Sequence, residues 1–203
     1  MSDSQSLSWL EIPAAETPPD DESAAIIGRC LSGEQAAYAD LYAFYSGMVY
    51  RLAYSLLQDS GDAEEVLQDS FEYAFRRLDH FDPRKSAFKT WLYRITISRC
   101  RNKRRRKWLP SLSLHLFEDR ELRDPAAAAP DDQALLGERR RAVWAAVNAL
   151  SPKLREVAIL RTYAGLPYAE IGQVLDIPAK TAESRMRLAH HALRESLREV
   201  IEE

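Results

Sequence analysis

Glycine and cysteine are scarce in this chain, whose 203 residues include seven glycines and two cysteines. Few glycines, together with long stretches in which apolar residues recur at helical spacing, favour an all-α protein. Cys30 and Cys100 lie far apart, without a CxxC motif or a partner histidine. We therefore expect reduced thiols rather than a disulfide framework or a zinc site.

Long apolar runs are also missing, and the first residues lack the basic start and apolar core of a signal peptide. We expect a cytoplasmic protein with no membrane insertion. There is no glycine-rich phosphate loop, and the four histidines have no cysteine or carboxylate partner at metal-ligand spacing. The sequence therefore predicts no metal, no cofactor and no enzymatic activity.

Acidic residues are absent from one segment, although the whole chain has a net charge of −3. Residues 84–107 hold eleven basic residues and no acid, and six of these bases fall in RNKRRRK. A charge of +11 over 24 residues creates a strong local field whatever the total charge. This segment is where a phosphate backbone is expected to bind.

Composition divides the chain into four parts. Residues 1–22 are acidic and contain three prolines, which is typical of a flexible tail. Residues 23–108 are expected to form one small helical domain, with helices near 24–31, 41–57, 62–78 and 86–107. Residues 109–136, acidic with three prolines, are expected to be a flexible linker, and residues 137–203 a second helical domain. Asp62 is expected to cap the third helix. Ser151, which is followed by proline, is expected to cap a helix of the second domain.

The second domain contains the pattern of a helix-turn-helix. A short helix over 168–175 is followed by Asp176-Ile177-Pro178, which breaks the period, and a second helix starts near Ala179. Five apolar residues of this second helix should face the core: Ala182, Met186, Ala189, Leu193 and Leu197. Lys180, Ser184 and Arg187 then point the opposite way as candidate base readers, with Arg185 as a candidate phosphate contact. The simpler alternative is an amphipathic helix with a solvated face, and the preceding half of the motif favours DNA contact.

The helix over 86–107 has two apolar faces with a polar stripe between them. Phe88, Trp91, Leu92 and Ile95 form one face, whereas Tyr93, Ile97 and Cys100 form the other. The stripe contains Arg94, Ser98, Arg101 and Arg105. Basic residues beside aromatic rings suit a nucleic acid with exposed bases. The alternative is a buried helix with a basic C-terminal end, in which the aromatic residues belong to the core.

An acidic face runs along the helix over 62–78. It contains Glu65, Gln68, Asp69 and Glu72. An acidic face repels phosphate, so a basic protein partner is one interpretation. Judged on charge alone, a solvated surface is the better one.

Taken together, the two halves resemble a bacterial sigma factor of the extracytoplasmic-function (ECF) group of the sigma-70 family. Region 2 of that family is matched by DLYAFYSGMVYRLAYSLLQDSGDAEEVLQDSFEYAFRRL and FDPRKSAFKTWLYRITISRCRNKRRRK, and region 4 by ALSPKLREVAILRTYAGLPYAEIGQVLDIPAKTAESRMRLAHHALRESL. The resemblance implies three partners: core RNA polymerase, contacted at its β′ clamp helices and β flap; promoter DNA; and, in many family members, an anti-sigma factor. It implies no chemistry, only binding of polymerase and recognition and opening of promoters of a stress- or signal-responsive regulon.

The resemblance also assigns the candidate residues. Polymerase binding is implied for Asp62, Glu65, Gln68, Asp69 and Glu72. Binding of the −10 element is implied for Phe81, Lys89, Trp91, Arg94, Ser98, Arg101, Asn102 and Arg105. Reading of the −35 element is implied for Lys180, Thr181, Glu183, Ser184, Arg185 and Arg187.

The chain departs from the family pattern in the helix-turn-helix. Asp176 stands where the turn usually has glycine, and Pro167 where the first helix usually has a serine cap; Glu183 replaces a lysine or methionine. Aspartate tolerates a left-handed backbone better than most residues, and glutamate can accept a hydrogen bond from cytosine. A stand-alone helix-turn-helix regulator and a helical scaffold without DNA contact are the alternative functions. The first leaves the acidic face without a role, and the second leaves the +11 segment unexplained.

Overall fold

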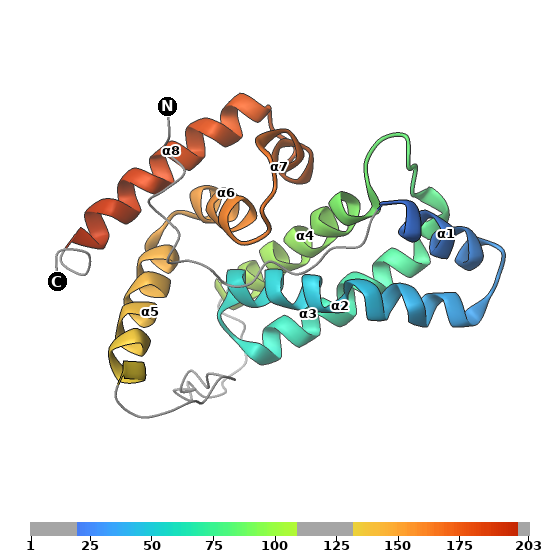
Figure 1. Ribbon diagram of the computed structural model, residues 1–203, viewed down its shortest axis with the longest axis horizontal. Coiled ribbons are helices and arrows are strands. Elements are labelled where there is room, and N and C mark those ends of the chain that lie inside the picture. Colours follow the sequence, from blue (N-terminus) through green and yellow to red (C-terminus); the bar gives the residue numbers. More distant parts are fainter. Residues whose placement is uncertain (1–19, 109–131, 199–203) are drawn as a thin grey trace.

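The computed structural model describes residues 20–108 and 132–198, and within these ranges the chain is helical with no strand. Figure 1 shows the helices in two groups. The first group contains α1 (Asp20–Leu31), α2 (Gln35–Leu57), α3 (Ser60–Arg76), the 3₁₀ turn η2 (Leu78–His80) and α4 (Phe88–Trp108). The second contains α5 (Asp132–Ala149), α6 (Pro152–Thr162), α7 (Tyr168–Leu175) and α8 (Ala179–Ser196). The all-α prediction is confirmed. Most of the predicted tail and linker lies outside the described residues.

The first group packs around α2, which contacts α1, α3 and α4. Its buried residues recur every three or four positions, as in Leu41, Tyr45, Val49 and Leu52, so one side of the helix faces the core. From α4, Leu92 is fully buried in the same core. Burying apolar area in this way is the main force that holds the three long helices together.

The N-terminus of α3 differs from the prediction. The helix starts at Ser60, and its cap is Asp59, whose carboxylate accepts a hydrogen bond from the Asp62 backbone N–H at 2.8 Å. Asp62 therefore does not cap this helix. Asp59 has an extended backbone directly before the helix, so its carboxylate can reach the free N–H groups of the first turn. The Asp62 side chain is then available for other partners.

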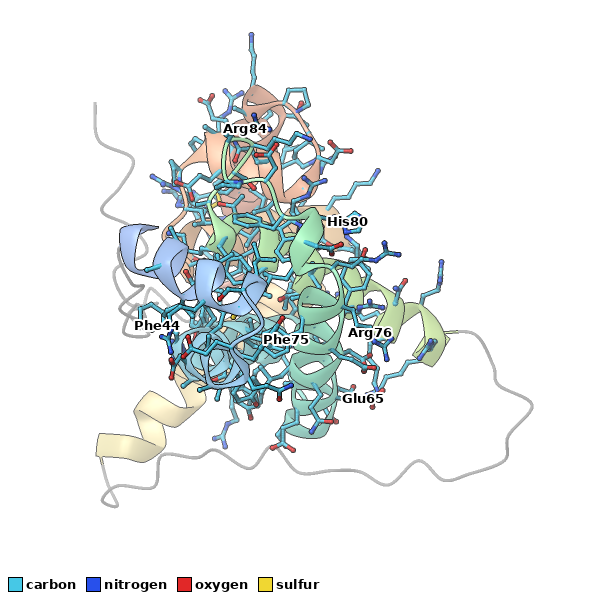
Figure 2. All side chains as sticks on the ribbon, turned by 90° about the vertical axis from the view of Figure 1, so that its right-hand side faces the viewer. Phe44, Glu65, Phe75, Arg76, His80 and Arg84 are labelled. Atoms are coloured by element: carbon cyan, nitrogen blue, oxygen red, sulfur yellow. The ribbon has the colours of Figure 1, made fainter. Side chains whose placement is uncertain are left out.

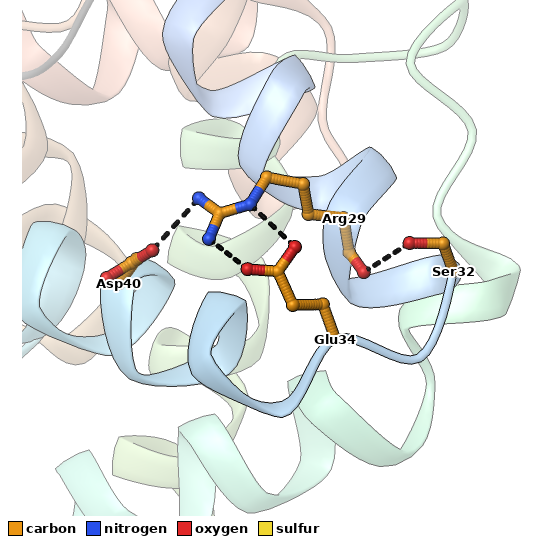
Figure 3. Close-up of polar contacts among 4 residues, drawn as sticks. All are labelled: Arg29, Ser32, Glu34 and Asp40. Atoms are coloured by element: carbon orange, nitrogen blue, oxygen red, sulfur yellow. Dashed lines mark hydrogen bonds and ion pairs between the residues drawn. The ribbon is translucent and has the colours of Figure 1, made fainter.

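A polar clamp closes the tight connection between α1 and α2 (Figure 3). The Arg29 guanidinium donates to Glu34 at 2.9 Å and to Asp40 at 3.0 Å. Gly33 has a positive φ of 91°, a conformation that suits glycine. The three charged side chains are 43–50% exposed, so these ion pairs add little to stability and mainly fix how α2 follows α1.

In the second group, a buried arginine joins α6 to the end of α5. Arg155 of α6 donates to the carbonyl oxygens of Val147 at 3.1 Å and Leu150 at 3.0 Å, and also to Asn148. Val147 and Asn148 lie in the last turn of α5 and Leu150 follows it, where a helix end leaves carbonyls short of backbone donors. Ser151 lies at the predicted cap position of α6, but its side chain makes no capping hydrogen bond.

The two groups are in contact. α7 packs on α4, and α6 packs on α2, so the second group lies beside the first rather than apart from it (Figure 1). The sequence predicts two domains and a linker, but gives no sign of this contact.

Candidate nucleic-acid and protein interfaces

The second helix of the helix-turn-helix, α8, has the two faces that the sequence predicts. All five apolar residues expected in the core are buried: Ala182, Met186, Ala189, Leu193 and Leu197. On the other side Lys180, Glu183 and Arg187 are exposed, while Thr181, Ser184 and Arg185 are half-buried. Arg187 donates to the Ser184 hydroxyl at 3.3 Å. The six candidate readers thus lie along the solvent-facing side of one helix.

The turn before α8 depends on two residues. Asp176 has φ 56° and ψ 52°, a left-handed conformation that aspartate tolerates better than most residues. Gly172 is buried, and a Cβ added to it would lie 2.7 Å from the carbonyl oxygen of Ile177. Sequence reasoning missed this second requirement. A glycine inside a short helix, where it weakens the helix, is the signal that could have revealed it.

The predicted stripe of α4 lies on the surface. Arg94, Ser98, Arg101 and Arg105 are all exposed, and Lys89 and Asn102 are half-buried. Other basic residues of this segment contact neighbouring helices instead. Arg99 stacks over the Tyr73 ring at 4.8 Å, so part of the segment holds α4 on α3.

Three aromatic rings form a cluster at the N-terminal end of α4. The ring centroids of Phe81 and Phe88 are 5.3 Å apart, those of Phe81 and Trp91 5.4 Å, and those of Phe88 and Trp91 5.6 Å. Phe88 is buried, whereas Phe81 and Trp91 are half-buried against the core. Tilted and edge-on rings at these distances attract one another, so the three rings pack stably while Phe81 and Trp91 stay partly accessible.

The acidic face of α3 has an inner and an outer part. Glu65, Gln68 and Glu72 are exposed and Asp69 is half-buried. Glu65 and Arg76 project outward from α3 (Figure 2), and Arg76 forms an ion pair with Glu72. The outer part is accessible to a partner.

Asp62 forms the inner part, because its side chain is 13% exposed and pairs with two lysines of α4. Lys103 lies 3.4 Å from Asp62 and also pairs with Glu65, and Lys107 pairs with Asp62. Burial lowers the pKa of Lys103, but the hydrogen bond from Lys103 to Glu65 and the charges of both acids outweigh it, so the net shift is upward. Two of the eleven bases thus fasten α4 to the start of α3.

The contact between the two groups contains charged and titratable side chains. Arg101 donates to both carboxylate oxygens of Glu156, at 2.8 and 2.7 Å. Tyr163, directly after α6, interacts with Ser55 of α2, and burial raises the pKa of Tyr163. Burial also raises the pKa of Tyr93 on α4.

No described helix is both long and apolar enough to cross a lipid bilayer. In the part of the chain that the structure describes, histidine, cysteine and acidic side chains nowhere gather in a group of three that could hold a metal ion. The arrangement offers binding surfaces: a basic stripe beside aromatic rings, an acidic face, and a polar face on a helix-turn-helix.

Comparison with known families matches both groups. Residues 41–109 match the family model of Sigma-70 region 2, and residues 140–193 match Sigma-70, region 4. The chain is 31% identical over 181 residues to the ECF RNA polymerase sigma factor SigW of Bacillus subtilis, with 86% of this chain and 96% of that protein covered. It is 34% identical over 176 residues to the ECF RNA polymerase sigma-E factor of Salmonella typhimurium, covering 83% and 90%.

Two solved structures have a similar fold. CnrH, in complex with the cytosolic domain of CnrY, is 25% identical with a TM-score of 0.62, and the match covers 85% of this chain and 95% of that one. The sigma factor RpoE from Bartonella quintana, in complex with the anti-sigma factor NepR, is 22% identical with a TM-score of 0.60, covering 79% and 96%.

Proposed function

The chain belongs to the ECF sigma factors of the sigma-70 family, which direct core RNA polymerase to promoters, and we propose how its surfaces divide that work. The observation that carries the proposal is the separation of charge on the folded surface. One helix presents a basic stripe, the neighbouring helix presents acids, and a third presents mixed polar residues on a helix-turn-helix. Each surface suits a different partner.

The helix-turn-helix reads the −35 element as a duplex. The start of α8 enters the major groove, where the exposed Lys180, Glu183 and Arg187 reach base edges. Arg187 can donate to guanine, and Glu183 can accept from the amino group of cytosine. Thr181, Ser184 and Arg185 contact the adjoining backbone and bases. Glu183 gives this chain a promoter preference that a lysine at the same position would not give.

The stripe on α4 holds the opened −10 strand. Arg94, Arg101 and Arg105 neutralise phosphates, while Ser98 and Asn102 supply hydrogen bonds. Lys89 lies at the start of the same helix, beside Phe81 and Trp91, whose partly accessible rings offer a stacking surface for a base that leaves the duplex. Because phosphate contacts dominate, affinity falls steeply as salt rises.

The outer part of the α3 acidic face binds polymerase through Glu65, Gln68, Asp69 and Glu72. Asp62, held by Lys103 and Lys107, supports this surface from behind by fixing the start of α3 on α4. The basic partner is the β′ clamp helices, and the second domain reaches the β flap. The protein works in the cytoplasm, without catalysis or a cofactor, on a stress- or signal-responsive regulon. An anti-sigma factor that covers these surfaces completes the set of partners.

The test is a charge reversal on the acidic face. Glu65→Lys combined with Asp69→Lys should abolish binding to purified core polymerase and protein-dependent transcription, while duplex binding by the second domain persists. Glu195→Lys, an exposed acid on α8, is the matched control and should retain core binding. Normal core binding by the double variant would refute the assignment of this face.

A further inference from the structure

Glu156 is a buried carboxylate at the contact between the two groups. Its side chain is 9% exposed, whereas the Arg101 side chain that grips it is 51% exposed. Arg101 donates two parallel hydrogen bonds to it, the geometry with which arginine also binds a phosphate. Arg104 is half-buried nearby and is attracted by the charge of Glu156. Glu156 therefore occupies the basic surface of α4 as an anion would.

The same contact covers the second apolar face of α4. Tyr93, Ile97 and Cys100 are all buried. Tyr93 is within electrostatic range of Glu170 on α7 and of Tyr163 directly after α6, and Cys100 is within electrostatic range of Glu156 on α6. Tyr93 and Cys100 therefore lie on the side of α4 that faces the second group, where α7 packs on α4.

The contact also contains an unfavourable feature. The Oε2 atom of Glu170 is buried and has no hydrogen-bond partner. A buried carboxylate oxygen without a partner opposes association, because it loses its hydration and gains nothing in return. The Arg101–Glu156 pair is therefore a favourable polar interaction in a contact that also carries an unfavourable one, as expected of a contact that opens.

We propose that Glu156 is an internal competitor for the −10 strand: while the two groups are closed, its carboxylate holds Arg101 and keeps this phosphate-binding residue from DNA. Opening releases Arg101 and uncovers α4. Lys180, Glu183 and Arg187 on α8 and Arg94, Ser98 and Arg105 on α4 stay exposed in the closed arrangement, so the pair withholds the Arg101 contact from the −10 strand and leaves the other candidate contacts accessible. This inference rests on the proposed role of Arg101 in strand binding.

The first experiment measures opening in the full chain. Cys100 reports on the contact, and Cys30, buried in α1, is an internal reference. Glu156→Gln should raise the alkylation rate of Cys100 but not of Cys30, and should increase the radius of gyration in X-ray scattering. Glu195→Gln, the matched control with the same loss of charge, should change neither. The exchanged pair Arg101→Glu with Glu156→Arg should restore the protection of Cys100 and the compact radius.

The second experiment measures binding of a short random single-stranded DNA pool. Glu156→Gln should tighten it by roughly three- to tenfold, since apparent affinity scales with the fraction of open molecules. Binding of a random duplex pool to the second domain should stay the same, which shows that α6 still folds. If Glu156→Gln does not fold, Arg101→Gln must give the same opening in the alkylation and scattering measurements.

The outcomes separate the two claims. If Glu156→Gln and Glu195→Gln give the same alkylation, radius and strand affinity while the natural chain initiates transcription, internal competition is refuted and the sigma-factor assignments stand. If the natural chain binds neither strand nor core polymerase, the proposed function fails whatever the scattering shows.

Discussion

Gly172→Ala tests how the recognition helix is positioned. The new Cβ would lie 2.7 Å from the Ile177 carbonyl oxygen and 3.3 Å from the Ala179 backbone nitrogen. Both atoms belong to backbone, so neither can swing away as a side chain would. The Ile177 N–H also bonds to the Gly172 carbonyl at 3.0 Å, which ties the turn to this point of α7. The methyl group must therefore push the start of α8 away from α7.

Gly28→Ala is the matched control, because Gly28 lies inside α1 with nothing within 4 Å of an added Cβ. Both substitutions gain about 1 kcal/mol of helix propensity, so the difference between them isolates the clash. Overpacking costs about 1–3 kcal/mol. In a protein of this size each kcal/mol shifts the Tm by about 2–4 °C, so Gly172→Ala should melt about 2–12 °C below Gly28→Ala.

Calorimetry gives the two melting temperatures, and binding of a −35 duplex shows whether the recognition helix has moved. We expect Gly172→Ala to lose duplex affinity and Gly28→Ala to keep it. If Gly172→Ala is as stable as Gly28→Ala and binds duplex equally well, the packing argument for the turn is wrong.

Three further predictions concern the rest of the chain. Arg155→Ala should destabilise the second domain by about 1–3 kcal/mol in urea denaturation, because the carbonyls that end α5 lose their buried donor; no change would show that water replaces it. Lys103→Ala should lower stability by about 1 kcal/mol and Arg106→Ala, on the exposed side of α4, by less, and equal effects would contradict the role of the α3–α4 ion pairs. Burial raises the pKa of Cys100 from 9.0 to about 12, so its contribution to stability is present below about pH 9 and is lost as pH rises toward 12. Cys100→Ala should therefore flatten the fall in stability over that window, and an unchanged slope would contradict the burial.

The sequence predicts the helices and their faces well, because both follow from local spacing. The buried side of α8 is predicted from neighbouring residues alone, whereas the left-handed Asp176 is expected from the resemblance to a family whose turn usually has glycine there. The cap of α3 is not predicted, because Asp59 and Asp62 are both good capping residues three positions apart. Only the path of the chain decides which carboxylate reaches the free N–H groups.

The contact between the two groups shows where sequence reasoning stops. The second apolar face of α4 is visible as Tyr93, Ile97 and Cys100, but its partner lies more than fifty residues away along the chain. Nothing local distinguishes Glu156 from the other acids of the second domain, and its role depends on tertiary packing. Lys103 illustrates the same point, since it belongs to the basic segment expected to bind phosphate, whereas the fold pairs it with Asp62 and Glu65.

The most direct test of the account is run-off transcription with purified core RNA polymerase, this protein and a pool of bacterial promoter DNA. The account predicts specific initiation that requires the protein and is lost when Glu65 and Asp69 are both changed to lysine. Duplex binding by the protein without any binding to core polymerase would contradict it, and would favour a regulator that acts on DNA alone.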